Sequence, residues 1–366
     1  MVKKKTVRKR LRQNGRIAAR RPRKNQAPPT TSCPSNPDVR QCQREFPIVG
    51  IGASAGGLDA LKNLLDTMPA EPGVALVVIQ HLDPTKASLA AELLARHTSM
   101  LVTQVNADVS IAANCVYVIP PNKNLSVSGG VLRLSKPEQP RGLRVPIDFF
   151  LRSLAQDQQQ RAVGVILSGT GADGTLGVKA IKAAGGLVLA QAPETAEHPG
   201  MPRSAITSGA VDHVVPVSEM SDILRRYAEH PYVRESVEER PPAEQAAPEE
   251  PLSDEDCPEN LNKILTQLRT QAKHDFHGYR RATLVRRIRR RMCLLHIDDY
   301  DQYVDYLCNH RPEIDSLVKD LLISVTDFFR DLEAWQELKE QVIVPLVDRK
   351  QGDEPIRVWV PGCATG

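Results

Sequence analysis

Three residues with the side chains of a serine-hydrolase triad stand near turns in the first half of this chain. Ser54 lies in the small-residue segment 50–57, His81 comes shortly after the apolar run 74–79, and Asp173 stands between alanine and glycine. A serine hydroxyl becomes a nucleophile when a base lies within hydrogen-bond reach and a third group orients that base. These residue types fit acyl transfer, although a helix cap, a polar loop residue and a turn former would explain them singly.

The spacing of apolar residues predicts the elements that would bring the three side chains together. Strand patterns alternate with helical patterns, which predicts an α/β fold with a doubly wound, mostly parallel sheet. The carboxyl ends of parallel strands open on one edge, so all three residues can converge there. The expected strands are 46–51, 74–79, 101–105, 115–119, 162–167, 187–190 and 211–215, and the expected helices are 58–68, 86–97, 147–156 and 176–184.

The segment 50–57 has a second interpretation, a dinucleotide-binding glycine turn between the first strand and the first helix. Such a turn needs an acidic residue at the end of the second strand to bind the ribose hydroxyl. The chain has Ile79, Gln80 and His81 there. The missing acid argues against a nucleotide-dependent α/β enzyme, which stays open as the alternative.

Four segments, at 51–57, 80–82, 168–174 and 199–205, carry a resemblance to a known family. Through them, residues 46–232 resemble the catalytic domain of the CheB family, the chemotaxis protein-glutamate methylesterases. The resemblance implies that Ser54 is the nucleophile, His81 the general base and Asp173 the carboxylate that orients His81. It also implies an oxyanion and substrate loop formed by Thr170, Gly171, Met201, Pro202 and Arg203.

The implied reaction is hydrolysis of glutamyl methyl esters on chemoreceptors through an acyl-enzyme, without a cofactor, and glutamine deamidation is a related family activity. The sequence departs from the family pattern at Ala55, Thr170 and Asn124, where threonine, methionine and histidine are common. These changes concern rate and substrate preference rather than reaction class. The 45 residues before Phe46 are too few for the receiver domain of many relatives, so phosphorylation in cis is not expected.

Residues 259–350 have helical patterns without strands, at 261–271, 279–295, 299–309, 312–322 and 332–347. The second pattern carries seven arginines and an apolar stripe, which predicts that the stripe packs inward while the arginines face solvent. So basic a helix suggests an acidic partner, although a solvated face explains it as well. The arginines are Arg280, Arg281, Arg286, Arg287, Arg289, Arg290 and Arg291.

Residues 259–366 resemble the N-terminal helical domain and first strand of CheR-type receptor methyltransferases, through 279–292, 325–331 and 357–366. The resemblance implies that the arginines bind an acidic receptor region and that 356–360 form a strand. It also implies S-adenosylmethionine as the cofactor of a full-length methyltransferase, bound by Thr326, Arg330, Gly362 and Gly366. Residues 351–366 would begin that cofactor domain, so we expect a fragment of an esterase–methyltransferase fusion that transfers no methyl group. A receptor-docking scaffold without catalysis is the remaining alternative.

Charge is distributed unevenly along the 366 residues. Residues 1–45 hold 14 Lys and Arg against 2 Asp and Glu, a net charge of +12, so the rest carries −8 of the total of +4. We expect a disordered basic tail at 1–45 and an acidic, proline-rich linker at 233–258. Aromatic residues make up 4% of the chain and none lies among the tail's basic residues, so no specific nucleic-acid partner is expected.

Cysteine usage and hydropathy exclude further classes of protein. The seven cysteines are scattered and form no C-x-x-C pair, so we expect neither a disulfide framework nor a bound metal. The longest apolar run, 74–79, is far shorter than a membrane helix, and the basic N-terminus lacks the apolar core of a secretory signal. We therefore expect a cytoplasmic protein that does not insert into membranes.

Overall fold

The computed structural model describes residues 46–80, 90–137, 144–234, 259–322, 332–349 and 356–359. The expected tail at 1–45 and nearly all of the expected linker lie outside these ranges. So do five predicted site residues, namely His81, Thr326, Arg330, Gly362 and Gly366.

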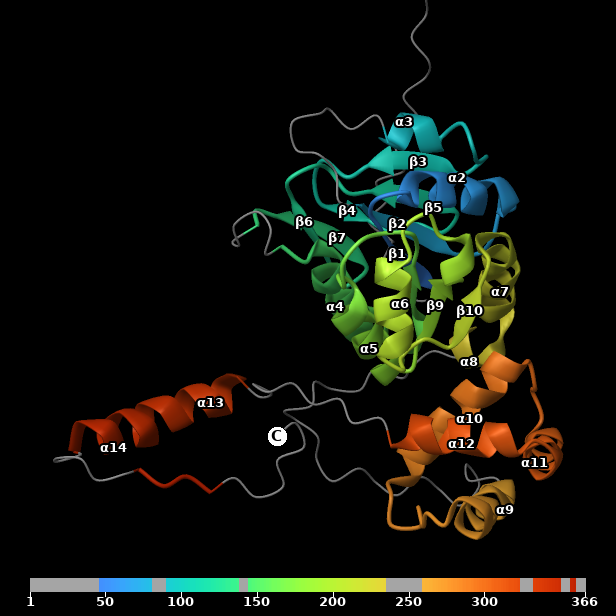
Figure 1. The fold of residues 1–366 in the computed structure, drawn as a ribbon, viewed down its shortest axis with the longest axis vertical. Coiled ribbons are helices and arrows are strands. Elements are labelled where there is room, and N and C mark those ends of the chain that lie inside the picture. Colours follow the sequence, from blue (N-terminus) through green and yellow to red (C-terminus); the bar gives the residue numbers. More distant parts are fainter. Residues whose placement is uncertain are drawn as a thin grey trace, which may run out of the picture. The chain divides into compact units, whose positions relative to one another are not determined.

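Seven strands form the expected parallel sheet, in the order β10-β9-β8-β1-β2-β5-β3 (Figure 1). The central strand β1 pairs with β2 on one side and β8 on the other, which makes it the point from which the chain winds outward in both directions. Ligand sites of doubly wound sheets form at the carboxyl ends of the strands around such a point. The bounds are β1 Ile48–Ala53, β2 Ala75–Gln80, β3 Leu101–Gln104, β5 Cys115–Val118, β8 Ala162–Ile166, β9 Leu187–Gln191 and β10 His213–Val215.

Helices cover both faces of the sheet because successive strand residues point to opposite sides. Val49 and Ile51 of β1 share a core with Leu61 of α2, whereas Ile48 lies in the core formed with α4. The first core includes α2 (Gly57–Thr67), α3 (Ala90–Leu94), α7 (Val217–Glu229) and α8 (Pro231–Arg234), and the second includes α4 (Pro146–Gln158), α5 (Thr175–Ala183) and α6 (Gly200–Thr207).

Helices α6, α7 and α8 were not predicted from the sequence. In α6 the helical pattern is hidden by Gly200 and Pro202, both poor helix formers, although proline is tolerated in the first turn where its missing N–H has no intrahelical partner. Helix α8 extends the folded part beyond the expected boundary at 232, because Val233 is fully buried.

A small antiparallel sheet was also missed. It has the order β4-β7-β6 and consists of β4 (Val109–Ser110), β6 (Asn124–Ser128) and β7 (Val131–Ser135). Gly129 and Gly130 join β6 to β7 with φ of 61° and 72°, as in the tight hairpin turns that favour paired glycines. The Asp157 carboxylate of α4 accepts both of their amide N–H groups, which fastens the hairpin to the main body.

The second half contains the expected helical module, defined here as residues 259–322. Its helices are α9 (Glu259–Gln267, continued as a π-helix over Leu268–Ala272), α10 (Arg281–Leu295), α11 (Tyr300–Asn309) and α12 (Arg311–Leu321). They share an apolar core that includes Ile264, Ile288, Leu307 and Leu317, each at most 1% exposed.

A second helical segment follows, with α13 (Leu332–Leu338), a π-helical stretch (Lys339–Ile343) and α14 (Val344–Arg349). The strand predicted at 356–360 is wrong for the residues that the structure describes, since 356–359 have no regular structure. Val358 and Trp359 are 78% and 87% exposed. A strand requires a neighbouring strand, and within the described ranges none pairs with this segment.

Candidate active site

Ser54 occupies a tight turn directly after β1, at the carboxyl edge of the sheet. Its amide N–H donates to the Ser168 carbonyl at 3.0 Å, and its own carbonyl accepts the Gly57 amide at 2.9 Å. Gly56 has φ of 68°, and a Cβ there would lie 2.6 Å from a carboxylate oxygen of Glu197. The turn thus requires glycine at this position and leaves Ser54 half-buried just before α2. In serine hydrolases with a nucleophile elbow, the nucleophile occupies a similar strand-to-helix turn.

Gly50 and Gly52 lie inside β1 and not in the turn. A Cβ on Gly52 would lie 2.5 Å from the Ile147 side chain, and one on Gly50 would lie 2.6 Å from the Leu151 side chain. These glycines allow α4 to pack against the central strand. Close helix packing therefore accounts for the pattern that suggested a dinucleotide turn.

Asp173 follows β8 and caps the N-terminus of α4. Its two carboxylate oxygens accept the amide N–H groups of Ile147 and Asp148, at 3.1 and 2.9 Å. The Asp148 carboxylate in turn accepts the amide of Gly177, at 2.7 Å, in the first turn of α5. Asp173, just before α5, thus caps α4, and Asp148 of α4 caps α5.

Asp148 is a buried carboxyl that the sequence analysis missed. Its side chain lies beside Asp173, and it is 6% exposed. Burial raises the pKa of Asp148, and the charge of Asp173 adds to the rise, while the N–H donors of the α5 N-terminus oppose it. The two acids and the two helix starts therefore form one rigid assembly at the carboxyl edge.

The register of the sheet brings the end of β2 beside the turn that bears Ser54. Ala53 pairs with Gln80, so the residue before Ser54 neighbours the residue before His81 on the adjacent strand. His81 itself lies outside the described residues. Its role as general base stays a prediction.

The predicted oxyanion and substrate loop adjoins Ser54. A Cβ on Gly169 would lie 2.2 Å from the Met201 sulfur and 2.9 Å from the Ser54 Cβ, so this glycine separates the two side chains. Gly169 also accepts the Met201 amide at 2.9 Å. Thr170 and Gly171 are exposed at the tip of the loop. Of the remaining predicted loop residues, Met201 and Pro202 are buried and Arg203 is exposed.

A polar network adjoining the turn that bears Ser54 was not anticipated. The Ser168 hydroxyl donates to the Ala55 carbonyl and accepts the His198 amide, both at 2.9 Å. The Ser168 amide donates to the Gln191 side chain at 2.9 Å, and the Gln191 amide group donates to the Thr195 carbonyl at 3.0 Å. Ser168 and Gln191 stand at the ends of β8 and β9, so their positions at strand ends were the available signal.

The arginines of α10 differ in exposure. Arg280, Arg281 and Arg289 are exposed, and Arg286 and Arg291 are partly buried. The expectation that the arginines face solvent is wrong for Arg287 and Arg290, which are 5% and 1% exposed. These two side chains have partners outside their own helix. The apolar stripe does pack inward, with Ile288 and Met292 among the buried side chains.

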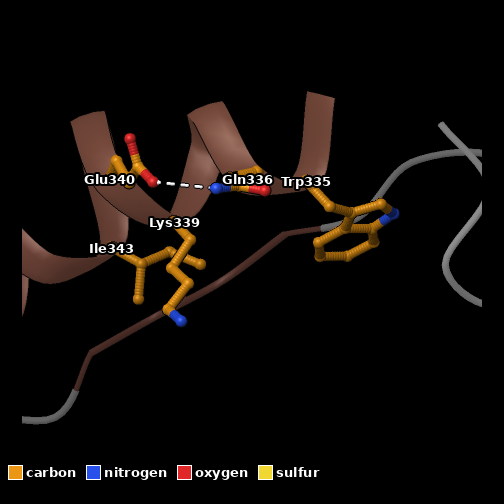
Figure 2. Close-up of a pocket in the computed structure, with 5 residues that line it drawn as sticks. All are labelled: Trp335, Gln336, Lys339, Glu340 and Ile343. Atoms are coloured by element: carbon orange, nitrogen blue, oxygen red, sulfur yellow. Dashed lines mark hydrogen bonds between the residues drawn. The ribbon is translucent and has the colours of Figure 1, made fainter. Parts of the chain in front are cut away.

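Figure 2 shows a surface hollow formed by one helical segment, α13 and the π-helical stretch after it. It is lined by Trp335, Gln336, Lys339, Glu340 and Ile343, with a 3.2 Å hydrogen bond from Gln336 to Glu340. None of the predicted site residues lines it. Among the described residues, no group of His, Cys, Asp and Glu is arranged to hold a metal ion, and no helix is long and apolar enough to cross a membrane.

Comparison with known proteins adds to this geometry. The family model for CheB methylesterase matches residues 49–224. A Leptospira interrogans protein, named provisionally as a protein-glutamate methylesterase/protein-glutamine glutaminase, is 32% identical over 182 residues, which cover 50% of this chain and 94% of that protein. The chain belongs to the CheB methylesterase family. Ser54, Asp173 and the loop from Thr170 to Arg203 all lie within this CheB domain.

Two further likenesses extend the comparison. The "Uncharacterized 104.1 kDa protein in hypE 3'region" of Rhodobacter capsulatus is 39% identical over 291 residues, covering 75% of this chain but 30% of that protein. The catalytic domain of the Thermotoga maritima CheB methylesterase is 31% identical, with 49% of this chain and 97% of that domain covered and a TM-score of 0.47.

The model for the all-alpha domain of CheR methyltransferases matches residues 259–322, the whole helical module. The match ends before the residues predicted to bind S-adenosylmethionine, and those residues also lie outside the described ranges. Binding of that cofactor by Thr326, Arg330, Gly362 and Gly366 stays a prediction.

Proposed function

We propose that the CheB domain of this chain hydrolyses glutamyl methyl esters of proteins, with Ser54 as the nucleophile. The observation that carries the proposal is the position of Ser54 in a glycine-dependent turn at the carboxyl edge. Asp173 and the loop at 169–171 meet at the same edge. The family membership supports the same reaction class.

In the proposed first step, His81 takes the proton of the Ser54 hydroxyl while the oxygen attacks the ester carbonyl carbon. The tetrahedral intermediate collapses when the protonated imidazole gives its proton to the leaving methoxide, which departs as methanol. Water, deprotonated by His81, then attacks the acyl carbon. The protonated His81 returns that proton to the Ser54 oxygen as the bond between this oxygen and the acyl carbon breaks, which frees Ser54 and releases the glutamic acid side chain, which ionises in water.

Backbone N–H groups of the loop at Thr170 and Gly171 are proposed to bind the oxyanion. Backbone donors retain this role when side chains change, so Thr170 does not exclude it. The loop is held in place by the Met201 amide on Gly169 and by the Ser204 hydroxyl, which donates to the Gly171 carbonyl at 3.2 Å. Fixed donors stabilise the transition state without reorganisation.

Asp173 is proposed to orient His81 and stabilise its protonated form. Two backbone N–H groups fix the Asp173 carboxylate, and a carboxylate oxygen can accept more than one hydrogen bond, including one from an imidazole N–H. An acid held in this way keeps the base in one tautomer and one orientation.

The proposed substrates are chemoreceptors or similar signalling proteins in the cytoplasm. The names of several relatives also include protein-glutamine glutaminase, so deamidation of glutamine by the same acyl route is part of the proposal. The exposed arginines Arg280, Arg281 and Arg289 are proposed to contact an acidic region of the receptor.

The test is methanol release from a methylated receptor fragment by wild type, Ser54→Ala and His81→Ala, with His198→Ala as the matched control. The His198 imidazole interacts with Glu197 at 3.6 Å and is partly exposed near the same edge. We expect loss of activity by at least about a thousandfold in the first two variants and little change in the third. Full activity of Ser54→Ala would refute the proposal, and loss in His198→Ala with activity in His81→Ala would reassign the base.

A further inference from the structure

Two of the arginines on α10 are buried although they carry charge. Arg290 is 1% exposed and Arg287 is 5% exposed, whereas the neighbouring Arg289 is exposed. Removing a guanidinium from water is costly unless hydrogen bonds and opposite charges compensate for the lost hydration. The partners of these two side chains therefore indicate what α10 is built to contact.

Arg290 joins residues from both parts of the chain. Its guanidinium donates to the Gly186 carbonyl at 3.1 and 2.8 Å, to the Asp212 carboxylate at 2.5 Å and to the Asp320 carboxylate at 2.6 Å. Gly186 and Asp212 precede β9 and β10 of the CheB domain, whereas Asp320 lies on α12 of the helical module. The two carboxylates and the carbonyl together occupy the planar donor fork of Arg290.

Lys182 and Arg287 extend the contact around Arg290. The Lys182 ammonium lies 3.3 Å from both the Asp212 and the Asp320 carboxylates. Arg287 donates to the carbonyls of Lys182 and Ala183, at 3.0 and 2.8 Å. These carbonyls lie at the C-terminal end of α5, where the helix dipole favours a cation.

The pKa shifts agree with a network that is paired in the folded chain. Burial alone would raise the pKa of Asp320, but Arg290, Lys182 and Arg291 hold it below its ordinary value. Burial lowers the pKa of Arg287 to about 10, with the charges of Arg286 and Arg290 acting in the same direction. Asp320 and Arg287 thus both remain charged at neutral pH.

Apolar packing accompanies these charges. Cys293 and Leu294, in the last turn of α10, are buried in the same core cluster as Tyr232 and Val233 of α8. Burial raises the pKa of the Cys293 thiol to about 12. The contact therefore combines an apolar part with an ionic part, as stable interfaces do.

The contact lies across the sheet from the candidate active site. Gly186 and Asp212 precede their strands, at the amino edge, whereas Ser54 and Asp173 follow β1 and β8, at the carboxyl edge. Because α10 docks at the amino edge, it does not cover the turn that bears Ser54.

We propose that the face of α10 bearing Arg287 and Arg290 is a docking surface whose occupant is the CheB domain of the same chain. The docked module and the CheB domain form one body in solution, with the esterase site on the far edge. Arg287 and Arg290 are then unavailable to an acidic receptor, whereas Arg280, Arg281 and Arg289 are exposed.

The test inserts a protease site into the segment 235–258 of the full chain and cleaves it after folding. The two fragments are expected to co-elute in size-exclusion chromatography, and their dissociation constant is then measured. Arg290→Met is expected to weaken their association by at least about tenfold, because it removes charged hydrogen bonds across the contact, while Arg289→Met leaves it unchanged.

Two variants on the CheB side, Asp212→Asn and Lys182→Met, leave the module's own sequence intact and are expected to weaken the association as well. Combining Arg290→Met with Asp212→Asn should weaken it less than the product of the single effects, since both remove the same contact. Circular dichroism checks that each variant keeps its helices. Separation of the wild-type fragments, or equal effects of the Arg289 and Arg290 changes, would overturn the proposal. Neither outcome depends on esterase activity.

Discussion

At the scale of single residues, Asp148 and Asp173 explain how a candidate catalytic acid is held in position. The Asp173 carboxylate accepts amide N–H groups at the start of α4, the helix that bears Asp148. The Asp148 carboxylate accepts an amide N–H group at the start of α5, the helix that follows Asp173. Removal of either acid therefore disturbs the helix start beside the other, although only Asp173 has a proposed role in the reaction.

Asp148 gives a prediction with a defined pH dependence. Its pKa is raised by burial above the ordinary value of 3.8, so ionisation costs folding free energy. This cost is absent below the unfolded pKa, grows as pH rises from the unfolded pKa to the raised folded pKa, and is constant above that value. Asp148→Asn keeps an acceptor for the Gly177 amide without the charge, and we expect it to be at least as stable as wild type at neutral pH.

The measurement is urea denaturation at about pH 7 and about pH 3.5. Any gain in the free energy of unfolding of Asp148→Asn over wild type should disappear at the lower pH. The control, Asp148→Ala, loses the acceptor and should lower the free energy of unfolding by about 1–2 kcal/mol at both pH values. If Asp148→Asn is less stable than wild type at neutral pH but not at the lower pH, the assigned direction of the pKa shift is wrong.

At the scale of elements, the position of α4 depends on the glycines of β1. A Cβ on Gly52 would lie 2.5 Å from the Ile147 side chain, at the helix start that Asp173 caps. A methyl group there must push α4 away from the sheet. The spacing of α4 from β1 and the position of Asp173 are therefore linked.

We expect Gly52→Ala to lower the free energy of unfolding by about 1–3 kcal/mol through overpacking, and to reduce methanol release as well. Gly164→Ala in β8 is the matched control, because its Cβ would make ordinary contacts, the nearest at 3.4 Å. This control should leave stability unchanged or raise it by up to about 1 kcal/mol. If denaturation shows equal effects of the two changes, the close packing of α4 against β1 does not require glycine at position 52.

The strands of the parallel sheet were largely predictable from sequence. The small hairpin and the long-range contacts of charged side chains were not. Apolar runs located all seven parallel strands, because strands covered on both faces are continuously apolar. The hairpin of β6 and β7 was missed although Gly129 and Gly130 lie between two alternating runs, a recognised hairpin signal. Periodicity assigns charged residues to solvent by default, so it could not anticipate that Arg290 would meet Asp212, which lies 78 positions away.

At the scale of the whole molecule, charge is carried mainly by the N-terminal segment. Without residues 1–45 the net charge changes from +4 to −8. We expect the full chain to be retained on a heparin column and released by salt, whereas residues 46–366 pass through, because surface charge governs such binding. Methanol release should be the same for both. Equal retention of the shorter chain would assign the binding to the exposed arginines of α10 instead.

The central claim is that Ser54 is the nucleophile of an esterase, and covalent labelling tests it most directly. A serine-reactive fluorophosphonate is reacted with the full chain, and the labelled peptide is identified by mass spectrometry. We predict one adduct, on Ser54, that forms in step with the loss of methanol release and is absent from Ser54→Ala. Complete loss of activity with the adduct on another residue, or full activity with Ser54 labelled, would contradict it.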